Sequence, residues 1–425
     1  MLKPLHRLPA SIGTLGLMSL AVLGTPAHAV PSYARQTGME CAGCHVGAFG
    51  PQLTPAGIQF KLGGYTDMDG KSGKVPLSAM VVAAFARTRA PQDPAPDHLK
   101  TNNNTTLDEA SVFLAGRLAD HVGSFAQVTY DGIGHSTALD QVDVRAAGTV
   151  KLGGVDTLLG VSLNNNPSVQ DPFNTLPAWG YPYKSPAAGF GTGAAASLLN
   201  GGLAQRVIGA SAYAFMNQSV YAELGSYRSL SSSLQSKLGA GPDTQRLGGN
   251  AYWRLAYFKD LKTRNYSLGL FGWNARLAPD RLAADTQDHY ADAGIDGSYQ
   301  FLGTREHMVT INGSWLRERK LEAATGDTSR LREQRLNASY HFNQTWGASA
   351  GWFNTTGSAS DASTLGRLVQ IDWTPWGKED SETPVLWSPL NLRLGAQYWM
   401  YSRFEGERAG ATDHNTLHLF AWTSF

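Results

Sequence analysis

Apolar and polar residues alternate with a period of two over most of the chain from residue 76 to residue 425. In the stretch EASVFLAGRLADHVGSFAQVTYDG, two alternating runs flank a short turn at residues 120–123. Alternation of this kind predicts strands, and a tight glycine-containing turn between two such runs predicts a β-hairpin. The arrangement recurs along the chain, with short connections such as KLGG, MNQS, KDLKTR, LGTRE and NQT. Read in this way, the chain contains about sixteen strands.

The connections between the predicted strands also alternate, between short turns and longer polar stretches. The long ones include residues 91–106, 164–204 and 230–246. An even strand number, short periplasmic turns and long extracellular loops are typical of bacterial outer-membrane barrels. The pattern therefore predicts an all-β fold, in which residues 76–425 form a porin-like transmembrane barrel of about 16 strands.

Composition favours this barrel over the alternative of a soluble β-sandwich or propeller. Charged residues make up 16% of the chain, whereas soluble domains contain about 25%. The net charge of +1 provides no attraction for nucleic acid. We therefore expect outer-membrane lipid, and not nucleic acid, to be a partner.

The first 29 residues have the pattern of a secretory signal peptide. Lys3 and Arg7 precede an apolar run from Ile12 to Leu23, and the small-residue motif AHA follows at residues 27–29. A membrane anchor is the alternative, but the run is too short to span a bilayer and a cleavage site follows it. We expect the mature chain to begin at Val30, outside the cytoplasm.

The only two cysteines, Cys41 and Cys44, stand in the pentapeptide CAGCH, which ends in His45. C-x-x-C-H is the attachment signature of c-type haem. Two thiols at this spacing capture the two vinyl groups of the porphyrin as thioethers, and the next residue then supplies an axial nitrogen to the iron. Export agrees with this reading, because c-type haem is attached outside the cytoplasm.

Three other uses of the cysteines compete with haem attachment. A Cys41–Cys44 disulfide would be strained at this spacing, and a thioredoxin-like redox pair would need a βαβ context that the chain lacks. A zinc site would need further ligands, and no other cysteine exists. We therefore predict one covalent haem c, with Cys41 and Cys44 as its attachment residues and His45 as an axial metal ligand.

The predicted haem segment, residues 30–75, is too short to enclose a haem with a core of its own. It is rich in glycine and poor in large apolar side chains. We therefore expect this monohaem cytochrome c segment to be a periplasmic plug in or against the mouth of the barrel, so that the barrel completes the haem pocket.

The second axial ligand matters because a methionine sulfur raises the haem potential relative to a second histidine. Met80 is the first candidate, since alternation in the first strand directs its side chain toward the lumen. Met68, in the turn TDMDG, is the alternative. A barrel histidine such as His121 or His307 and a five-coordinate iron also stay open.

The stretch ARQTGMECAGCHVGAFGPQLTPAGIQFKLGGYT, residues 34–66, resembles the fused monohaem cytochrome–porins of iron-oxidising bacteria. The resemblance is carried by A-R-Q-T-G-M at residues 34–39, by the C-x-x-C-H pentapeptide, and by L-T-P-x-G-x-x-F-K-L-x-G-Y at residues 53–65. It covers the N-terminal tenth of the chain. The barrel matches this family in architecture and length only.

The resemblance implies an electron-transfer oxidoreductase of the Fe(II) oxidase (iron:cytochrome c reductase) type. Such a protein takes electrons from an extracellular donor, Fe(II) in the best-known members, through its haem to periplasmic c-type cytochromes. The resemblance does not fix the donor. Two other functions stay open, namely a solute porin with a structural or sensory haem plug, and a periplasmic haem-binding β protein.

A single haem is much smaller than the apolar band of about 25 Å that a barrel presents to lipid. The donor must therefore enter the lumen, or approach the haem within tunnelling reach. Carboxylates and imidazoles of the predicted loops could attract Fe(II), although such groups are usually only solvated. They are Asp93, Asp97, His98, Asp131, His135, Asp285, Asp288, His289, Asp413 and His414.

Overall fold

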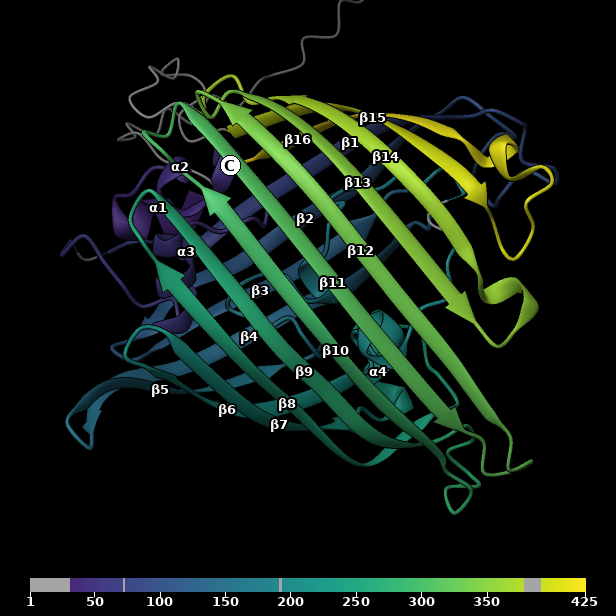
Figure 1. The fold of residues 1–425 in the computed structure, drawn as a ribbon, viewed down its shortest axis with the longest axis horizontal. Helices are drawn as coiled ribbons and strands as arrows, with labels where there is room; N and C mark the ends of the chain where they lie inside the picture. Colours follow the sequence, from purple (N-terminus) through teal and green to yellow (C-terminus); the bar gives the residue numbers. More distant parts are fainter. Residues whose placement is uncertain (1–30, 72, 191–192, 378–390) are drawn as a thin grey trace, which may run out of the picture.

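The computed structural model describes residues 31–71, 73–190, 193–377 and 391–425. Sixteen antiparallel strands close into one barrel, in which each strand pairs with its sequence neighbours and β1 pairs with β16 (Figure 1). The strands are β1 Leu77–Thr88, β2 Asn104–Ala119, β3 Val122–Asp131, β4 Ser136–Leu152, β5 Val155–Asn164, β6 Val207–Met216, β7 Val220–Ser229, β8 Arg246–Asp260, β9 Arg264–Ala278, β10 Asp288–Phe301, β11 His307–Leu321, β12 Thr328–Phe342, β13 Trp346–Gly357, β14 Thr364–Trp373, β15 Asn391–Arg403 and β16 Thr416–Ser424. The predicted barrel of about 16 strands is confirmed.

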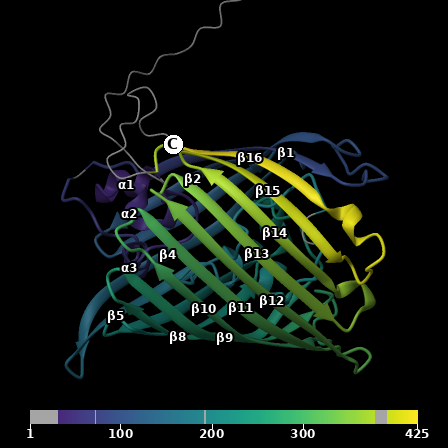
Figure 2. The same ribbon diagram turned by 45° about the horizontal axis from the view of Figure 1, so that its top comes forward.

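Three short helices precede the barrel: α1 Pro31–Thr37, α2 Cys41–Cys44 and α3 Pro55–Leu62. They lie together at one end of the barrel, the end at which the chain also terminates (Figures 1 and 2). A fourth helix, α4 Ser232–Lys237, lies between β7 and β8. None of the described helices is long and apolar enough to cross a membrane. The predicted signal peptide, residues 1–29, lies outside the described residues.

The short turns lie at the same end of the barrel as helices α1–α3. Examples are the connections between β4 and β5 at Gly153 and Gly154, and between β6 and β7 at residues 217–219. Gly153 and Gly154 have φ of 57° and 85°, a region that glycine enters without a steric penalty. Because short turns face the periplasm in such barrels, this end is the periplasmic mouth. The connection after β14 lies partly outside the described residues.

The barrel wall has the polarity expected in lipid. On β14, Val369 and Ile371 face outward and are 48% and 67% exposed, whereas the intervening Gln370 and the next inward residue, Asp372, are each 5% exposed. A closed barrel satisfies all its strand hydrogen bonds within the wall, which allows it to span a bilayer. An apolar exterior, a polar interior and this topology are those of an outer-membrane barrel. A soluble sandwich or propeller is excluded by the closed single sheet.

The long connection between β5 and β6 folds back into the barrel. We call it the inner segment, residues 165–190 and 193–206. Val169, Leu176 and Leu203 are each 0% exposed, and Leu176 packs with Leu198 and Leu199 against Phe271 and Trp273 of the wall. The expectation that residues 164–204 form an outer loop is therefore wrong. The segment carries enough large apolar side chains to be stabilised by burial inside the lumen.

Candidate functional site

The CAGCH pentapeptide is held by the residues that follow it. Cys41 to Cys44 form the single turn of α2, and the His45 amide donates to the Cys41 carbonyl at 2.8 Å. Thr54 caps α3 and also binds the turn, because its amide donates to the Cys44 carbonyl at 2.9 Å and its hydroxyl donates to the Gly43 carbonyl at 2.6 Å. The turn and α3 therefore form one unit.

Gly57 allows helix α3 to pack directly against the C-x-x-C turn. A Cβ added at Gly57 would lie 2.4 Å from the Cys44 carbonyl oxygen, far inside van der Waals contact. Any larger residue at this position would push α3 away from the C-x-x-C turn. The glycine in L-T-P-x-G therefore has a direct physical role in placing the two cysteines.

The barrel wall fixes the pentapeptide from outside. The Asn391 side-chain amide of β15 donates to Cys41 Sγ at 3.2 Å and to the Ala48 carbonyl at 3.0 Å. Arg305, in the β10–β11 turn, donates to the Ala42 carbonyl at 2.6 Å, and Gln300 of β10 donates to the Leu53 carbonyl at 2.8 Å. Strands on different sides of the lumen thus hold residues 31–71 at the periplasmic mouth.

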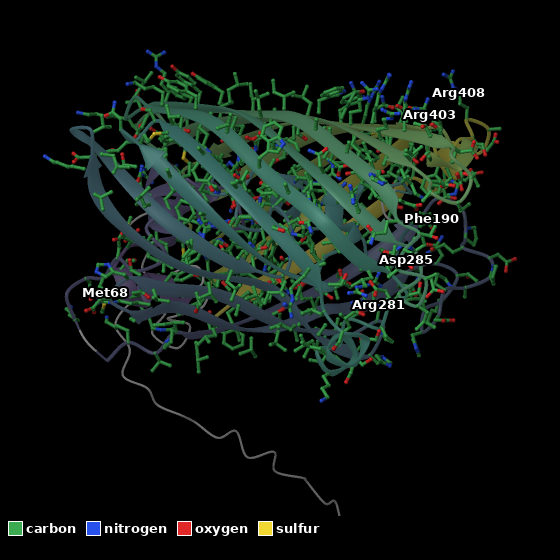
Figure 3. The ribbon with its side chains drawn as sticks, turned by 90° about the horizontal axis from the view of Figure 1, so that it is seen from below. Met68, Phe190, Arg281, Asp285, Arg403 and Arg408 are labelled. Atoms are coloured by element: carbon green, nitrogen blue, oxygen red, sulfur yellow. The ribbon has the colours of Figure 1, made fainter. Side chains whose placement is uncertain are left out.

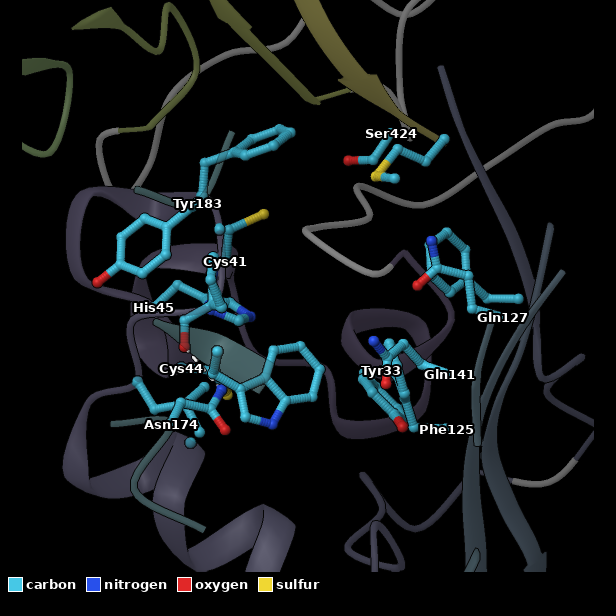
Figure 4. Close-up of a pocket in the computed structure, with 18 of the residues that line it drawn as sticks. Tyr33, Cys41, Cys44, His45, Phe125, Gln127, Gln141, Asn174, Tyr183 and Ser424 are labelled. Carbon is cyan, nitrogen blue, oxygen red and sulfur yellow. Dashed lines mark hydrogen bonds between the residues drawn. The ribbon is translucent and has the colours of Figure 1, made fainter. Parts of the chain in front are cut away.

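A cavity of about 550 Å³ opens between this segment and the wall, within the range of roughly 300–1,000 Å³ usual for ligand pockets. Cys41, Cys44 and His45 line one side of it (Figure 4). Tyr33, Phe125 and Ser424 lie across the cavity in the same view. The cavity is largely apolar, since aromatic rings including Phe49, Phe60, Phe113, Trp179 and Trp422 contribute to its walls.

The environment of His45 suits an iron ligand. Burial lowers the pKa of His45 to about 4, against a smaller raising effect of the Gly50 backbone. The imidazole is therefore neutral near pH 7, as a metal ligand must be. Its Nδ1 has no partner of normal hydrogen-bond geometry among the described residues. Burial also raises the pKa of Cys44 to about 11, so this thiol is protonated near pH 7.

Met80 lies on the opposite wall from His45. It pairs in register with Ser424 across the β1–β16 seam, and directly paired residues share a face of the sheet. Ser424 and His45 lie on opposite sides of the cavity in Figure 4. Met80 is 9% exposed and lines the cavity, as does Ser78, so the inward face predicted for this strand is observed.

The other candidates for the second axial position lie elsewhere. Met68 accepts a hydrogen bond from Arg117 at 2.8 Å and lies toward the rim of the periplasmic mouth (Figure 3). His121 is exposed in the turn between β2 and β3. The side chain of His307 is 56% exposed, and its Nδ1 lies 2.7 Å from the Tyr340 hydroxyl. None of these three lines the cavity of the C-x-x-C-H residues, whereas Met80 does. Met39 lines it too, but it stands two residues before Cys41 and is therefore poorly placed to reach the face opposite His45.

The inner segment closes the deep side of the cavity. The sequence analysis did not predict that this segment contributes to the site. Lys61 of α3 donates to the Val169 carbonyl and to Asn174 Oδ1, both at 2.8 Å, and the Asn174 amide donates to the Pro51 carbonyl at 2.7 Å. Lys61 lies over the Trp179 ring, 4.6 Å from its centroid. Burial, with repulsion from Arg145, lowers the pKa of Lys61 to about 7. The aromatic and proline residues of PFNTLPAWGYPY, residues 172–183, are the sequence feature that could have indicated a packed segment here and not a solvated loop.

The donor set and the cavity fit a c-type haem. Two thiols three residues apart and a neutral imidazole line one wall, a thioether lies on the opposite wall, and aromatic rings fill much of the rest. Lys184 and Arg335 also line this cavity, as do Glu109 and Asp140, and Lys184 is paired with Glu109 at 3.2 Å.

Comparisons with known proteins extend only to the barrel. No protein-family model matches the chain, and no curated protein matches it. Among solved structures, the chain is similar to an anion-selective porin from Comamonas acidovorans, with 11% identity over 82% of this chain and 98% of that chain and a TM-score of 0.46. It is also similar to OprB of Pseudomonas putida, with 9% identity over 82% and 93% of the two chains and a TM-score of 0.49. These likenesses are too distant to indicate what this chain binds or transports.

Proposed function

We propose that this chain is an outer-membrane electron-transfer protein of the cytochrome–porin type, which takes electrons from an extracellular donor, Fe(II) in the first instance, and delivers them to a periplasmic c-type cytochrome. The observation that carries the proposal is the placing of Met80 across the cavity from His45, with Cys41 and Cys44 on the His45 side. This arrangement unites the C-x-x-C-H motif with a barrel strand in one site.

Each residue of the site has a separate task in holding the cofactor. Cys41 and Cys44 would form the thioethers, and His45 and Met80 would supply the two axial ligands. Haem c bound in this way supplies a one-electron Fe(III)/Fe(II) couple whose potential is raised by a methionine ligand. The aromatic walls keep water from that centre, and the hydrogen bonds from Asn391 and Arg305 keep the attachment turn in place.

The position of the site suits delivery of electrons to the periplasm. The cavity is lined by residues at the periplasmic strand ends, such as Ser78 and Ser424, so a soluble cytochrome can approach it from that mouth. Toward the extracellular side, the buried inner segment occupies the lumen. The periplasmic mouth is therefore the acceptor side, and a donor from the extracellular side must move past the inner segment to come within tunnelling reach of the haem.

Stopped-flow visible spectroscopy tests this proposal directly. The oxidised, detergent-purified protein is mixed with Fe(II), and the reduced c-type α-band is followed. We expect the band to appear with a rate that rises with Fe(II) concentration, each Fe(II) losing one electron. A c-type spectrum that dithionite reduces but Fe(II) does not would overturn iron as the donor.

A solute porin with a haem plug is the second candidate, because the barrel itself has porin-like architecture. It requires an open path past the inner segment and the helices at the mouth. Measured ion conductance in planar bilayers separates the two functions, since the proposed electron-transfer protein should conduct weakly. The third possibility, a periplasmic protein without a membrane role, is disfavoured by the apolar exterior of the wall.

Met80→Ala is expected to lower the reduction potential of the haem and to abolish its methionine–iron charge-transfer absorption. The expected shift is on the order of 0.1 V, within the roughly 0.8 V range over which axial ligands tune haem iron. Spectroelectrochemical titration measures it. Met68→Ala is the matched control and should leave both properties unchanged. A potential that changes in Met68→Ala but not in Met80→Ala would assign the ligand to Met68.

A further inference from the structure

Two extracellular connections bring two histidines together at the end of the barrel opposite the haem cavity. His98 belongs to the connection between β1 and β2, and His135 to the connection between β3 and β4. Their ring centroids lie 4.7 Å apart with an interplanar angle of 39°. Both side chains are exposed. Both residues are among the loop carboxylates and imidazoles that the sequence offered as possible Fe(II) ligands. Although they belong to different loops, their rings are in contact.

Local hydrogen bonds hold both loops in the conformations that present these rings. The amides of Ile133 and Gly134 donate to Asp131 Oδ1 at 2.8 and 3.0 Å, which fixes the turn before His135. The Gln92 amide donates to the Thr101 carbonyl at 2.7 Å, which closes the loop that carries His98. Each imidazole is therefore displayed from an ordered turn.

Both histidines have left-handed backbone conformations, with φ of 63° for His98 and 50° for His135. Non-glycine residues are uncommon in this region, and such conformations cost energy that the surrounding turn must supply. The two imidazoles contact each other through their rings. Neither imidazole makes a hydrogen bond or an ion pair with another residue of the described part of the chain.

We propose that His98 and His135 together form an extracellular binding site for a divalent transition-metal ion. Two imidazoles that bind one ion with metal–nitrogen distances of about 2.0–2.1 Å hold their ring centres about 5 Å apart, close to the separation observed. Imidazole suits zinc, copper, iron and nickel, and it does not suit calcium or magnesium. The ligand class is therefore a borderline divalent cation.

The site is open and exchanging, unlike a structural metal site. Among the described residues, no group of three or more His, Cys, Asp or Glu is arranged to hold a metal ion. Water must therefore complete the coordination of an ion at His98 and His135, as at open zinc sites. An ion bound in this way is retained weakly and remains accessible. The role of this site in holding a donor ion rests on the proposed function. The existence of the metal site does not depend on that function.

Zinc(II) is the probe for this site, because it is redox-inert and binds nitrogen ligands more tightly than Fe(II) does. Isothermal titration calorimetry is done on the full detergent-solubilised chain without a polyhistidine tag. We expect one ion to bind per chain, and we expect His98→Gln and His135→Gln each to weaken binding at least tenfold. His289→Gln is the matched control, since His289 is also an exposed histidine on an extracellular strand end.

Equal zinc affinity in the wild type and in both variants would overturn the site, provided that all proteins show the heat-modifiable mobility of folded barrels. The haem takes no part in this titration, so its result is independent of the proposed function. A second readout uses Fe(II) reduction kinetics. If the ion held here is the donor, both variants should require more Fe(II) for half-maximal rate and reach the same maximal rate. Zinc binding without Fe(II) reduction would retain the site and remove the proposed function.

Discussion

Replacing both Cys41 and Cys44 with serine is expected to abolish covalent haem while the barrel still folds. The two thiols are the only ones in the chain, so no other residue can form a thioether. The wall does not depend on them, because every strand pairs with its neighbours through its own backbone. Haem peroxidase staining after denaturing electrophoresis should fall from a strong band to background, and heat-modifiable mobility should be unchanged.

The single variants provide the matched controls for this result. Cys41→Ser and Cys44→Ser each keep one thiol, so staining should be weakened but retained. A stained band of wild-type intensity in the double variant would show that haem is attached elsewhere or not covalently, and would remove the assignment of the CAGCH turn. Loss of heat-modifiable mobility in the double variant would instead mean that the N-terminal segment is needed for barrel folding.

The barrel could be predicted from sequence because its signal is local. Each strand shows its own alternation, and the periplasmic hairpins other than β14–β15 have a short turn such as KLGG. The inward direction of Met80 follows from the same alternation, since a one-residue slip would reverse every side chain of β1. The C-x-x-C-H motif was also readable, because its chemistry depends on residues that are adjacent in the chain.

The inner segment could not be predicted because its partners are far away in sequence. Its backbone amides are bound by carboxylates of the wall: Ser197 by Glu333 at 2.7 Å, Leu198 by Glu318 at 2.6 Å, and Leu199 by Asp292 at 3.0 Å. These carboxylates lie on three consecutive strands, β10, β11 and β12. In the sequence they look like the inward polar residues of any barrel with a polar lumen. Only the closed barrel shows that they point at one loop.

The sequence alone favours Met80 over Met68 only through the alternation of the first strand. Both methionines follow the haem motif within a short span, and the turn that carries Met68 could also fold back over the cavity. In the structure their positions differ: strand register places Met80 beside Ser424, and Arg117 donates a hydrogen bond to Met68. Such long-range pairings leave no periodic trace in the chain.

Arg254→Met is expected to release the inner segment and to open the lumen to ions. Arg254 is 0% exposed. Its two terminal nitrogens each donate to Asp296 at 2.9 Å, and its Nε lies 3.3 Å from Asp171 of the inner segment. Asp171 in turn accepts hydrogen bonds from the Thr175 and Leu176 amides at 2.8 and 3.0 Å. The guanidinium is thus a buried ionic link between the wall and the part of the inner segment around Asp171.

Removing one partner of a buried ion pair leaves an uncompensated charge and costs about 3–5 kcal/mol. The cost falls on the inner segment, because the segment can leave the lumen and hydrate Asp171 while the wall strand cannot. Single-channel recording in planar bilayers should therefore show low conductance for the wild type and a several-fold increase for Arg254→Met. Arg228→Met, which removes an exposed arginine of β7, is the matched control and should conduct like the wild type.

A triple variant, Asp171→Asn with Arg254→Met and Asp296→Asn, separates lost charge balance from lost packing. It removes all three buried charges, and replacing a buried ionic group with neutral groups of similar volume is often close to neutral in free energy. Conductance should therefore return part of the way to the wild-type value. If the wild type already conducts as freely as Arg254→Met, the inner segment does not block the lumen, and the solute-porin function is favoured over the electron-transfer function.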